Sequence, residues 1–169
     1  PITNASASND GPLTCAKTTV VLSAFPLDGV SYSWSGGGIS QTKSVSTPGA
    51  YTVTITKIAT GCTASATTTV VQDIVKPNPT ATNNGPLTCA KTSVNLISTG
   101  GGSYLWSNGG TSAQISVSSV GVYTVTVTAD NGCTATATTQ VSEDILRPIA
   151  NATNDGPLTC AKTCASKNV

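Results

Sequence analysis

The chain contains six cysteines, and their thiols are its most reactive side chains. Cys62 and Cys133 each follow a glycine, in the tracts GCTASATTTV and GCTATATTQV. Three others end the tract GPLTC, which occurs at residues 11–15, 85–89 and 156–160. A thiol can attack a substrate, bind a metal ion or form a disulfide, and its neighbours decide which of these it does. The surrounding residues therefore decide the class of protein.

Metal and nucleophilic chemistry both lack the residues that they need. The chain has no histidine and no CxxC pair, so its cysteines lack the spacing and the companion ligands of the usual zinc sites. Glu143 is the sole glutamate and six aspartates are spread along the chain, so neither an acid–base pair nor a Ser-His-Asp triad can be assembled. We therefore expect disulfides, and we expect that the protein is not an enzyme.

The cysteine tracts recur with a repeated module. Their period of about 70 residues is typical of an array of small modules. We assign repeat 1 to residues 1–75, repeat 2 to residues 76–147 and a truncated third repeat to residues 148–169. Cys160 and Cys164 of the third repeat stay unassigned: they could pair with each other, one could link two chains, or the tail could be foreign to the array.

Each complete module holds one GPLTC cysteine and one Gly-Cys cysteine. We therefore predict intramodule disulfides Cys15–Cys62 and Cys89–Cys133, each contributing about 4 kcal/mol in the chain-entropy model. Modules of this size have marginal hydrophobic cores, so a covalent staple in each is expected. Disulfides persist in oxidising compartments, which indicates an extracellular, cell-surface protein.

The charge pattern favours neither nucleic acid nor membrane as a partner. Eight Lys and Arg residues are balanced by seven Asp and Glu residues, the net charge is +1, and the lysines are scattered. No stretch approaches the roughly 18 consecutive apolar residues that can span a bilayer. Asp73 and Asp144, near the module ends, could give oxygen ligands to a junction calcium site, or they could simply cap strand ends. No other cofactor is expected.

Alternating apolar and polar residues predict β-strands throughout. In YTVTIT (51–56) and YTVTVT (123–128), a large apolar side chain occupies every second position and threonine the others. The following Gly-Cys tracts alternate Cys or Ala with Thr or Ser. About six or seven short strands per module, with no helical period, predict tandem antiparallel β-sandwiches.

Four aromatic residues are expected in the cores. Trp34 and Trp106 precede Gly-rich turns, and we expect each to pack against the disulfide between the two sheets. Tyr51 and Tyr123 begin strands and are expected to pack inward as well. The alternative for the tryptophans is an exposed ring that stacks on sugars.

The order of YSWSGG, PGAYTVTIT and GCTASATTTV resembles the PKD-like and immunoglobulin-like repeats of large bacterial surface adhesins, in particular those of SprB-type gliding-motility adhesins. The resemblance covers both full modules. It implies immunoglobulin-like β-sandwiches, export to the cell surface and a role as filament or stalk, with no catalytic residues. PKD domains commonly have an acidic, Gly-rich turn after the tryptophan, whereas this chain has SGGG (35–38) and SNGG (107–110).

The junctions favour a structural role. DIVKP (73–77) and DILRP (144–148) are short, partly apolar and Pro-containing, which predicts stiff joints. We expect a structural repeat of a secreted adhesin or extracellular filament. Its partners are neighbouring repeats or copies of itself, in one variant through a strand donated by the third repeat. The alternative function is a carbohydrate- or surface-binding module with loops 25–28 and 100–103 as contacts.

Overall fold

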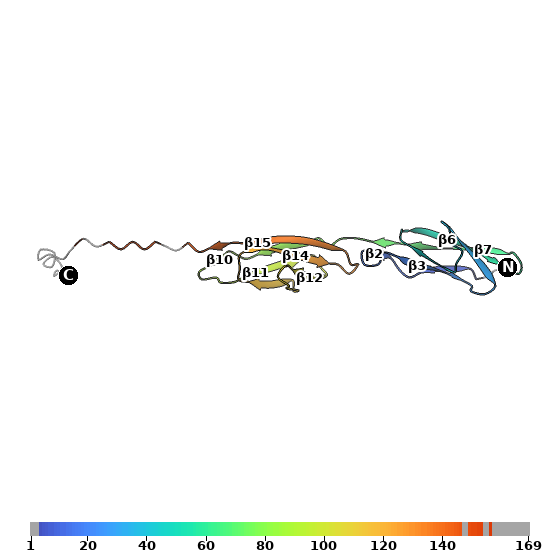
Figure 1. Ribbon diagram of the computed structural model, residues 1–169, viewed down its shortest axis with the longest axis horizontal. Coiled ribbons are helices and arrows are strands. Elements are labelled where there is room, and N and C mark those ends of the chain that lie inside the picture. The colour runs from blue at the N-terminus through green and yellow to red at the C-terminus, as the bar shows by residue number, and fades with distance from the viewer. Residues whose placement is uncertain (1–3, 147–148, 154–155, 157–169) are drawn as a thin grey trace.

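Figure 1 shows an elongated molecule in which two β-sandwiches lie end to end. The computed structural model describes residues 4–146, 149–153 and 156, and this part of the chain consists of strands, turns and loops without a helix. No helix that could cross a membrane is therefore found among these residues. The predicted third repeat, residues 148–169, lies largely outside the described residues.

The first sandwich is built from eight strands. They are β1 (Ser6–Asn9), β2 (Leu13–Thr14), β3 (Val20–Phe25), β4 (Val30–Trp34), β5 (Thr42–Val45), β6 (Gly49–Lys57), β7 (Thr63–Val70) and β8 (Gln72–Asp73). One antiparallel sheet has the order β1-β3-β5 and the other β4-β6-β7. Strands β2 and β8 pair in parallel, with Thr14 opposite Asp73. This pairing places the first GPLTC tract beside the C-terminal end of the sandwich.

The second sandwich repeats this topology. Its strands are β9 (Thr80–Asn83), β10 (Leu87–Thr88), β11 (Val94–Thr99), β12 (Ser103–Trp106), β13 (Gln114–Val117), β14 (Gly121–Thr128), β15 (Thr134–Val141) and β16 (Glu143–Asp144). The sheets have the orders β9-β11-β13 and β12-β14-β15, and β10 pairs in parallel with β16. The prediction of tandem antiparallel β-sandwiches is confirmed.

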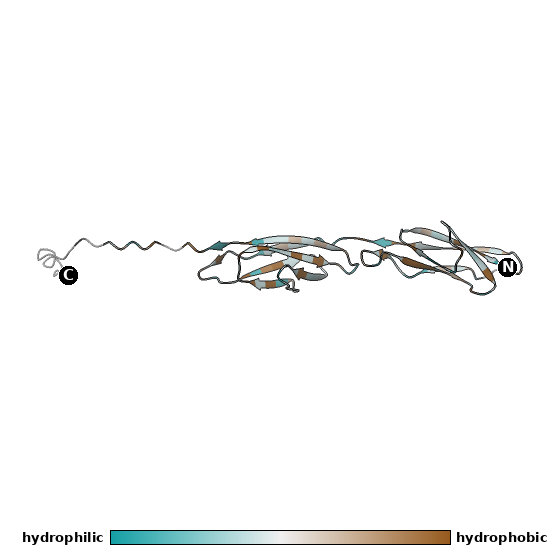
Figure 2. Cartoon of the chain, in the orientation of Figure 1, coloured by the Kyte–Doolittle hydropathy of each residue, from teal (hydrophilic) through white to brown (hydrophobic). Residues whose placement is uncertain are grey.

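Alternation places one face of each long strand in a core. Val53 and Ile55 of β6 and Val125 and Val127 of β14 are fully buried, and the threonines between them are half-buried. Complete burial of such a side chain contributes about 1.5–3 kcal/mol. Figure 2 shows the result as pale strands with brown segments, while the short polar strands β8 and β16 are teal. Each sandwich has its own buried cluster.

The tryptophans lie inside these clusters. Trp34 is 3% exposed and Trp106 is 1% exposed. Their indole Nε1 atoms donate hydrogen bonds to the backbone oxygens of Ser40 and Ser112, at 2.9 and 3.0 Å. Because the rings are buried and their N–H groups are satisfied, neither ring has a free face for a sugar.

Tyr51 and Tyr123 are half-buried and pack against the same cores. Each hydroxyl donates a hydrogen bond to the backbone oxygen four residues upstream, of Thr47 at 2.9 Å and of Ser119 at 3.0 Å. The arrangement resembles the tyrosine corner of immunoglobulin-like sandwiches. It ties the preceding turn to the start of a core strand in both units.

Candidate functional site: a disulfide-bridged joint

A disulfide between Cys15 and Cys133 joins the two sandwiches. The two Cα atoms are 4.9 Å apart, although the residues are 118 positions apart in the sequence. Cys15 follows β2 at the C-terminal end of the first sandwich, and Cys133 lies in the β14–β15 hairpin of the second. The bond therefore spans the joint between the units.

The predicted pairings Cys15–Cys62 and Cys89–Cys133 are wrong. Cys62 and Cys89 are free, exposed thiols. The reason is strand geometry: Cys62 precedes the eight-residue strand β7, whereas Cys15 lies beside β8, which follows it. At about 3.3 Å per residue, β7 separates the two by roughly 26 Å, and a disulfide tolerates a Cα separation of about 7 Å at most. Strand β15 separates Cys89 from Cys133 in the same way.

The expectation of one disulfide within each module is replaced by one disulfide across the joint. The two buried clusters consist of aliphatic side chains and one tryptophan each, with no cystine among them. The expected packing of Trp34 and Trp106 against an inter-sheet disulfide is therefore wrong as well. The sandwiches are held by their own packing, and the covalent bond acts between them.

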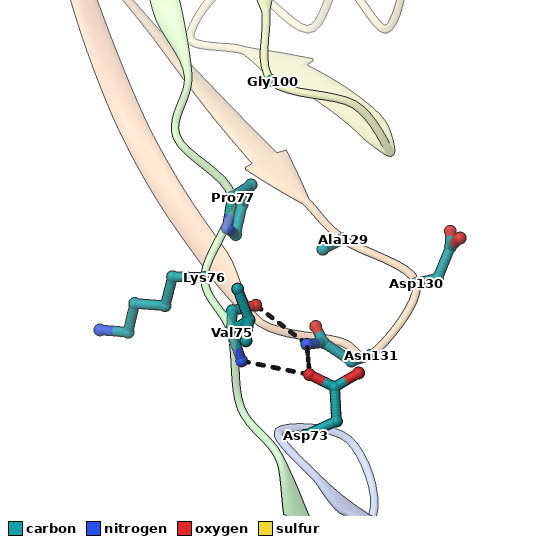
Figure 3. A pocket seen from close by; sticks show the side chains of 8 residues that line it. All are labelled: Asp73, Val75, Lys76, Pro77, Gly100, Ala129, Asp130 and Asn131. Carbon is teal, nitrogen blue, oxygen red and sulfur yellow. Dashed lines mark hydrogen bonds between the residues drawn. The ribbon is translucent and has the colours of Figure 1, made fainter.

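Asn131 makes the side-chain hydrogen bonds of the joint, as Figure 3 shows. Its Nδ2 donates to Oδ1 of Asp73 and to the backbone oxygen of Val75, both at 2.9 Å. Its Oδ1 accepts a hydrogen bond from the backbone N–H of Cys133 at 3.0 Å. One amide group thus connects the hairpin of the second sandwich to the end of the first, directly beside the disulfide.

The hairpin and the GPLTC turn are also in backbone contact. The Ala16 N–H donates to the backbone oxygen of Asn131 at 3.3 Å. A Cβ atom on Gly132 would lie 2.5 Å from Cβ of Ala16 and 2.9 Å from its nitrogen. Gly132 also has φ of 78°, a conformation that glycine adopts without strain. A glycine at this position allows the two elements to touch.

The linker between β8 and β9 is held against the second sandwich. A Cβ atom on Gly100 would lie 3.0 Å from Cα of Pro79, so the backbone of the 99–102 turn and the linker are in close contact. Pro77 and Pro79 restrict the linker further, because proline fixes φ. The contact fixes the C-terminal end of the linker on the second sandwich, next to the Thr80–Thr99 pair of β9 and β11.

A shallow, open hollow lies beside the linker. It is lined by Asp73, Val75, Lys76, Pro77, Gly100, Ala129, Asp130 and Asn131. Oδ1 of Asp73 already accepts hydrogen bonds from Asn131 and from the backbone N–H of Val75. Asp144 is exposed in β16. The described residues contain no group of three or more His, Cys, Asp or Glu that could hold a metal ion, so calcium binding stays a prediction.

Asn131, Gly132 and Ala16 are joint residues that sequence reasoning does not identify. One signal is present: repeat 2 reads ADNGC where repeat 1 reads IATGC, so a side-chain amide occurs before only one of the two Gly-Cys pairs. Cys160 and Cys164, the two unassigned cysteines, lie outside the described residues.

The chain matches no model of a known protein family and no curated protein. Among solved structures it is similar to the three N-terminal domains of the highly immunogenic outer capsid protein (Hoc) of bacteriophage RB49, with 20% identity and a TM-score of 0.51 over 83% of this chain and 59% of that one. It is also similar to a structure from a 1.5-MDa bacterial ice-binding adhesin, with 12% identity and a TM-score of 0.49 over 84% of this chain and 64% of that one. The four N-terminal Ig domains of Dscam1 isoform 8.4 give 14% identity and a TM-score of 0.31, over 85% of this chain and 48% of that one.

These likenesses concern the fold. The chain spans less than two thirds of each of these structures. Together with the strand topology, the likeness to the Hoc domains defines the two units as immunoglobulin-like β-sandwiches in tandem. In this chain the two units are bridged by the Cys15–Cys133 disulfide.

Proposed function

We propose that this chain is a structural segment of a secreted cell-surface adhesin or extracellular filament, in which it acts as a stiff spacer. The observation that carries the proposal is the joint: one disulfide, one backbone hydrogen bond and the Asn131 amide all act on a single contact between the sandwiches. Linkers that lack such contacts leave adjacent domains free to reorient. A joint restrained in this way converts two small domains into a short rod.

An extracellular location is part of the proposal, and the disulfide supports it because such bonds persist in oxidising compartments. We assign the chain to the PKD-like repeats of SprB-type adhesins on the motifs that it shares with them. We also propose a division into repeat 1 at residues 1–75, repeat 2 at 76–147 and a truncated third repeat at 148–169. Neighbouring repeats are the proposed partners.

The structure offers less support for the alternative of a sugar-binding module. Both tryptophans are buried, so the aromatic surface that commonly stacks on a sugar is absent at these positions. Loops 25–28 and 100–103 stay candidate contacts, with Phe25 and Leu27 exposed in the first loop. A screen against immobilised glycans would distinguish this function from that of a spacer, which should bind none.

The test of the spacer function compares the wild-type protein with Cys15→Ser/Cys133→Ser in solution. Small-angle X-ray scattering should give the wild type a narrow distribution of lengths and the variant a broader and shorter one. NMR relaxation should show the two wild-type sandwiches tumbling as one body, and they should become independent in the variant. The matched control is Cys62→Ser/Cys89→Ser, which leaves the joint intact and should behave as the single, uncoupled wild-type chain. Independent tumbling of the two wild-type sandwiches would contradict the proposal.

A further inference from the structure

Among the described residues, Cys62 and Cys89 are the cysteines that remain outside the joint. Cys62 lies in the β6–β7 hairpin, at the end of the first sandwich that faces away from the joint. Cys89 follows β10, which Figure 1 shows at the far end of the second sandwich. The two exposed thiols therefore mark the opposite ends of the rod.

The turn that carries Cys89 is a copy of the turn that contributes to the joint. In the first sandwich the Thr14 N–H donates to Lys17 O at 2.8 Å, and the Lys17 N–H donates to Oγ1 of Thr14 at 2.9 Å. In the second sandwich Thr88 and Lys91 form the same two bonds, both at 2.9 Å. Cys89 is thus presented as Cys15 is, but no hairpin of the described part of the chain pairs with it.

The hairpin that carries Cys62 is likewise a copy of the one that carries Cys133. Lys57 N donates to the backbone oxygen of Cys62 at 2.8 Å, and Ala129 N donates to that of Cys133 at 2.9 Å. In both hairpins the cysteine follows a glycine in the left-handed region, with φ of 68° in the first and 78° in the second. The first hairpin is one residue longer.

The surfaces beside these thiols are the two halves of the contact seen in the joint. There, Gly132 lies against Ala16. Gly61 holds the place of Gly132 at one end of the rod, and a Cβ atom on it would meet nothing within 4 Å. Ala90 holds the place of Ala16 at the other end and is exposed. Among the described residues, each end therefore shows one unoccupied half of an interface that the molecule itself contains.

On the proposed function of a disulfide-jointed rod, we propose that Cys89 and Cys62 are coupling sites that join this chain head to tail with a second copy. Cys89 of one copy bonds to Cys62 of the next, and the joint so formed repeats the one between the two sandwiches. When each bond forms, the two cysteine thiols lose two protons and two electrons. A small-molecule disulfide accepts them and is reduced to two thiols. Cys62–Cys62 and Cys89–Cys89 bonds between copies are not expected, because the joint needs one turn and one hairpin.

One residue sets the new joint apart from the existing one. Thr60 stands where Asn131 stands in the second hairpin, and its Oγ1 accepts the N–H of Cys62 at 3.5 Å. Threonine has no amide that could reach across to Asp144, the counterpart of Asp73. The coupling between copies therefore rests on the disulfide and on the backbone contact.

The experiment uses the full chain with Cys160→Ser and Cys164→Ser, so that the bonds observed come from the described cysteines alone. Cys62→Ser and Cys89→Ser versions are incubated with reduced and oxidised glutathione, each alone and as an equal mixture. Non-reducing electrophoresis and mass spectrometry of the linked peptides then identify the bonds. We expect the Cys62–Cys89 dimer of the mixture to exceed the two like dimers together by at least about fivefold, which corresponds to about 1 kcal/mol.

A second variant separates docking from simple thiol reactivity. Gly61→Ala keeps the Cys62 thiol but places a methyl group where it would strike Ala90 of the neighbouring copy. It should lower the yield of coupled chains severalfold, with Trp34 fluorescence as the check that the sandwich remains folded. Mixed dimers amounting to only half of all dimers, or none at all, would overturn the coupling.

The same peptide map reports on the joint itself. If Cys15–Cys133 is found without Cys62–Cys89, head-to-tail coupling is refuted and the spacer function stands. If Cys15–Cys62 and Cys89–Cys133 are found instead, both proposals fail together.

Discussion

At the scale of single residues, Asn131 stabilises the joint through both atoms of its side-chain amide. Its amide nitrogen binds Asp73 and the linker, and its amide oxygen holds the backbone at Cys133. The disulfide and these hydrogen bonds act on the same contact, so they should be thermodynamically coupled. Removal of the amide should therefore lower the equilibrium constant for forming the Cys15–Cys133 disulfide.

We predict that Asn131→Ala lowers the equilibrium constant for forming Cys15–Cys133 from glutathione roughly fivefold, because the net loss is about 1 kcal/mol. The measurement is the fraction of bonded protein across a series of glutathione ratios. Thr60→Ala is the matched control, since it removes the corresponding cap in the first hairpin, away from the joint. Equal constants for wild type and Asn131→Ala would show that the amide does not restrain the joint.

Asp10 forms a pH-dependent contact at the surface of the first sandwich. It forms an exposed ion pair with Lys17, with 3.0 Å between Nζ and Oδ2, and its Oδ1 accepts the Val21 N–H at 2.8 Å. The hydrogen bond from Lys17, and then that from Val21, hold the pKa of the Asp10 carboxyl below its ordinary value. In the second sandwich Asn84 occupies this position and accepts the Asn95 N–H at 2.8 Å.

Because the folded-state pKa of Asp10 lies below the unfolded-state value of about 3.9, its carboxylate stabilises the fold above that value. This stabilisation is lost as the pH falls through the folded-state pKa. We predict that wild type is slightly more stable than Asp10→Asn at neutral pH and that the difference vanishes in acid. Urea unfolding over a pH series measures it. A difference that grows on acidification would contradict this sign.

At the scale of elements, the joint depends on a hairpin and a turn that touch without side chains between them. Gly132→Ala would place a methyl group 2.5 Å from Cβ of Ala16, so the two elements would have to move apart. Gly61 has the same left-handed backbone but open space around it. A comparison of alanine substitutions at Gly132 and Gly61 therefore distinguishes the effect of steric contact from that of backbone strain.

We predict that Gly132→Ala and Gly61→Ala each destabilise their own hairpin by about 1–2 kcal/mol, the cost of a left-handed L residue. Only Gly132→Ala should also loosen the joint of the single chain, seen as faster reduction of Cys15–Cys133 by dithiothreitol. Equal reduction rates in the two variants would show that the contact with Ala16 does not matter.

The strands themselves were predictable from sequence because alternation is a local signal. Val53 and Ile55 occupy alternate positions with threonine between them, and such a pattern satisfies a strand with one buried face and one wetter face. The cores around Trp34 and Trp106 follow from the same pattern, because large apolar residues in several strands must share one interior.

The end of the sandwich at which each cysteine lies was not predictable in the same way. Spacing shows that Cys15 and Cys62 belong to one repeat, but it does not show that they lie at opposite ends of it. That information comes from the parallel pairing of β2 with β8, which takes the GPLTC tract to the far end of the sandwich. Two-residue strands leave almost no pattern in a sequence, so the pairing and the disulfide that depends on it were missed.

At the scale of the whole molecule, the disulfide connects domains that already have separate cores. A bond across the joint does little for the packing inside either sandwich, but it limits the orientations that one can take relative to the other. In an array each unit contributes its own stability and its contacts with its nearest neighbours. A covalent contact between neighbours would carry tension along such an array without relying on the linker alone.

The most direct test of this joint is a disulfide map of the unreduced protein, with free thiols blocked before digestion and the linked peptides sequenced by mass spectrometry. We predict one peptide pair that contains Cys15 and Cys133, together with blocked thiols at Cys62 and Cys89 in the single chain. Peptide pairs that join Cys15 to Cys62 and Cys89 to Cys133 would contradict the disulfide-bridged joint.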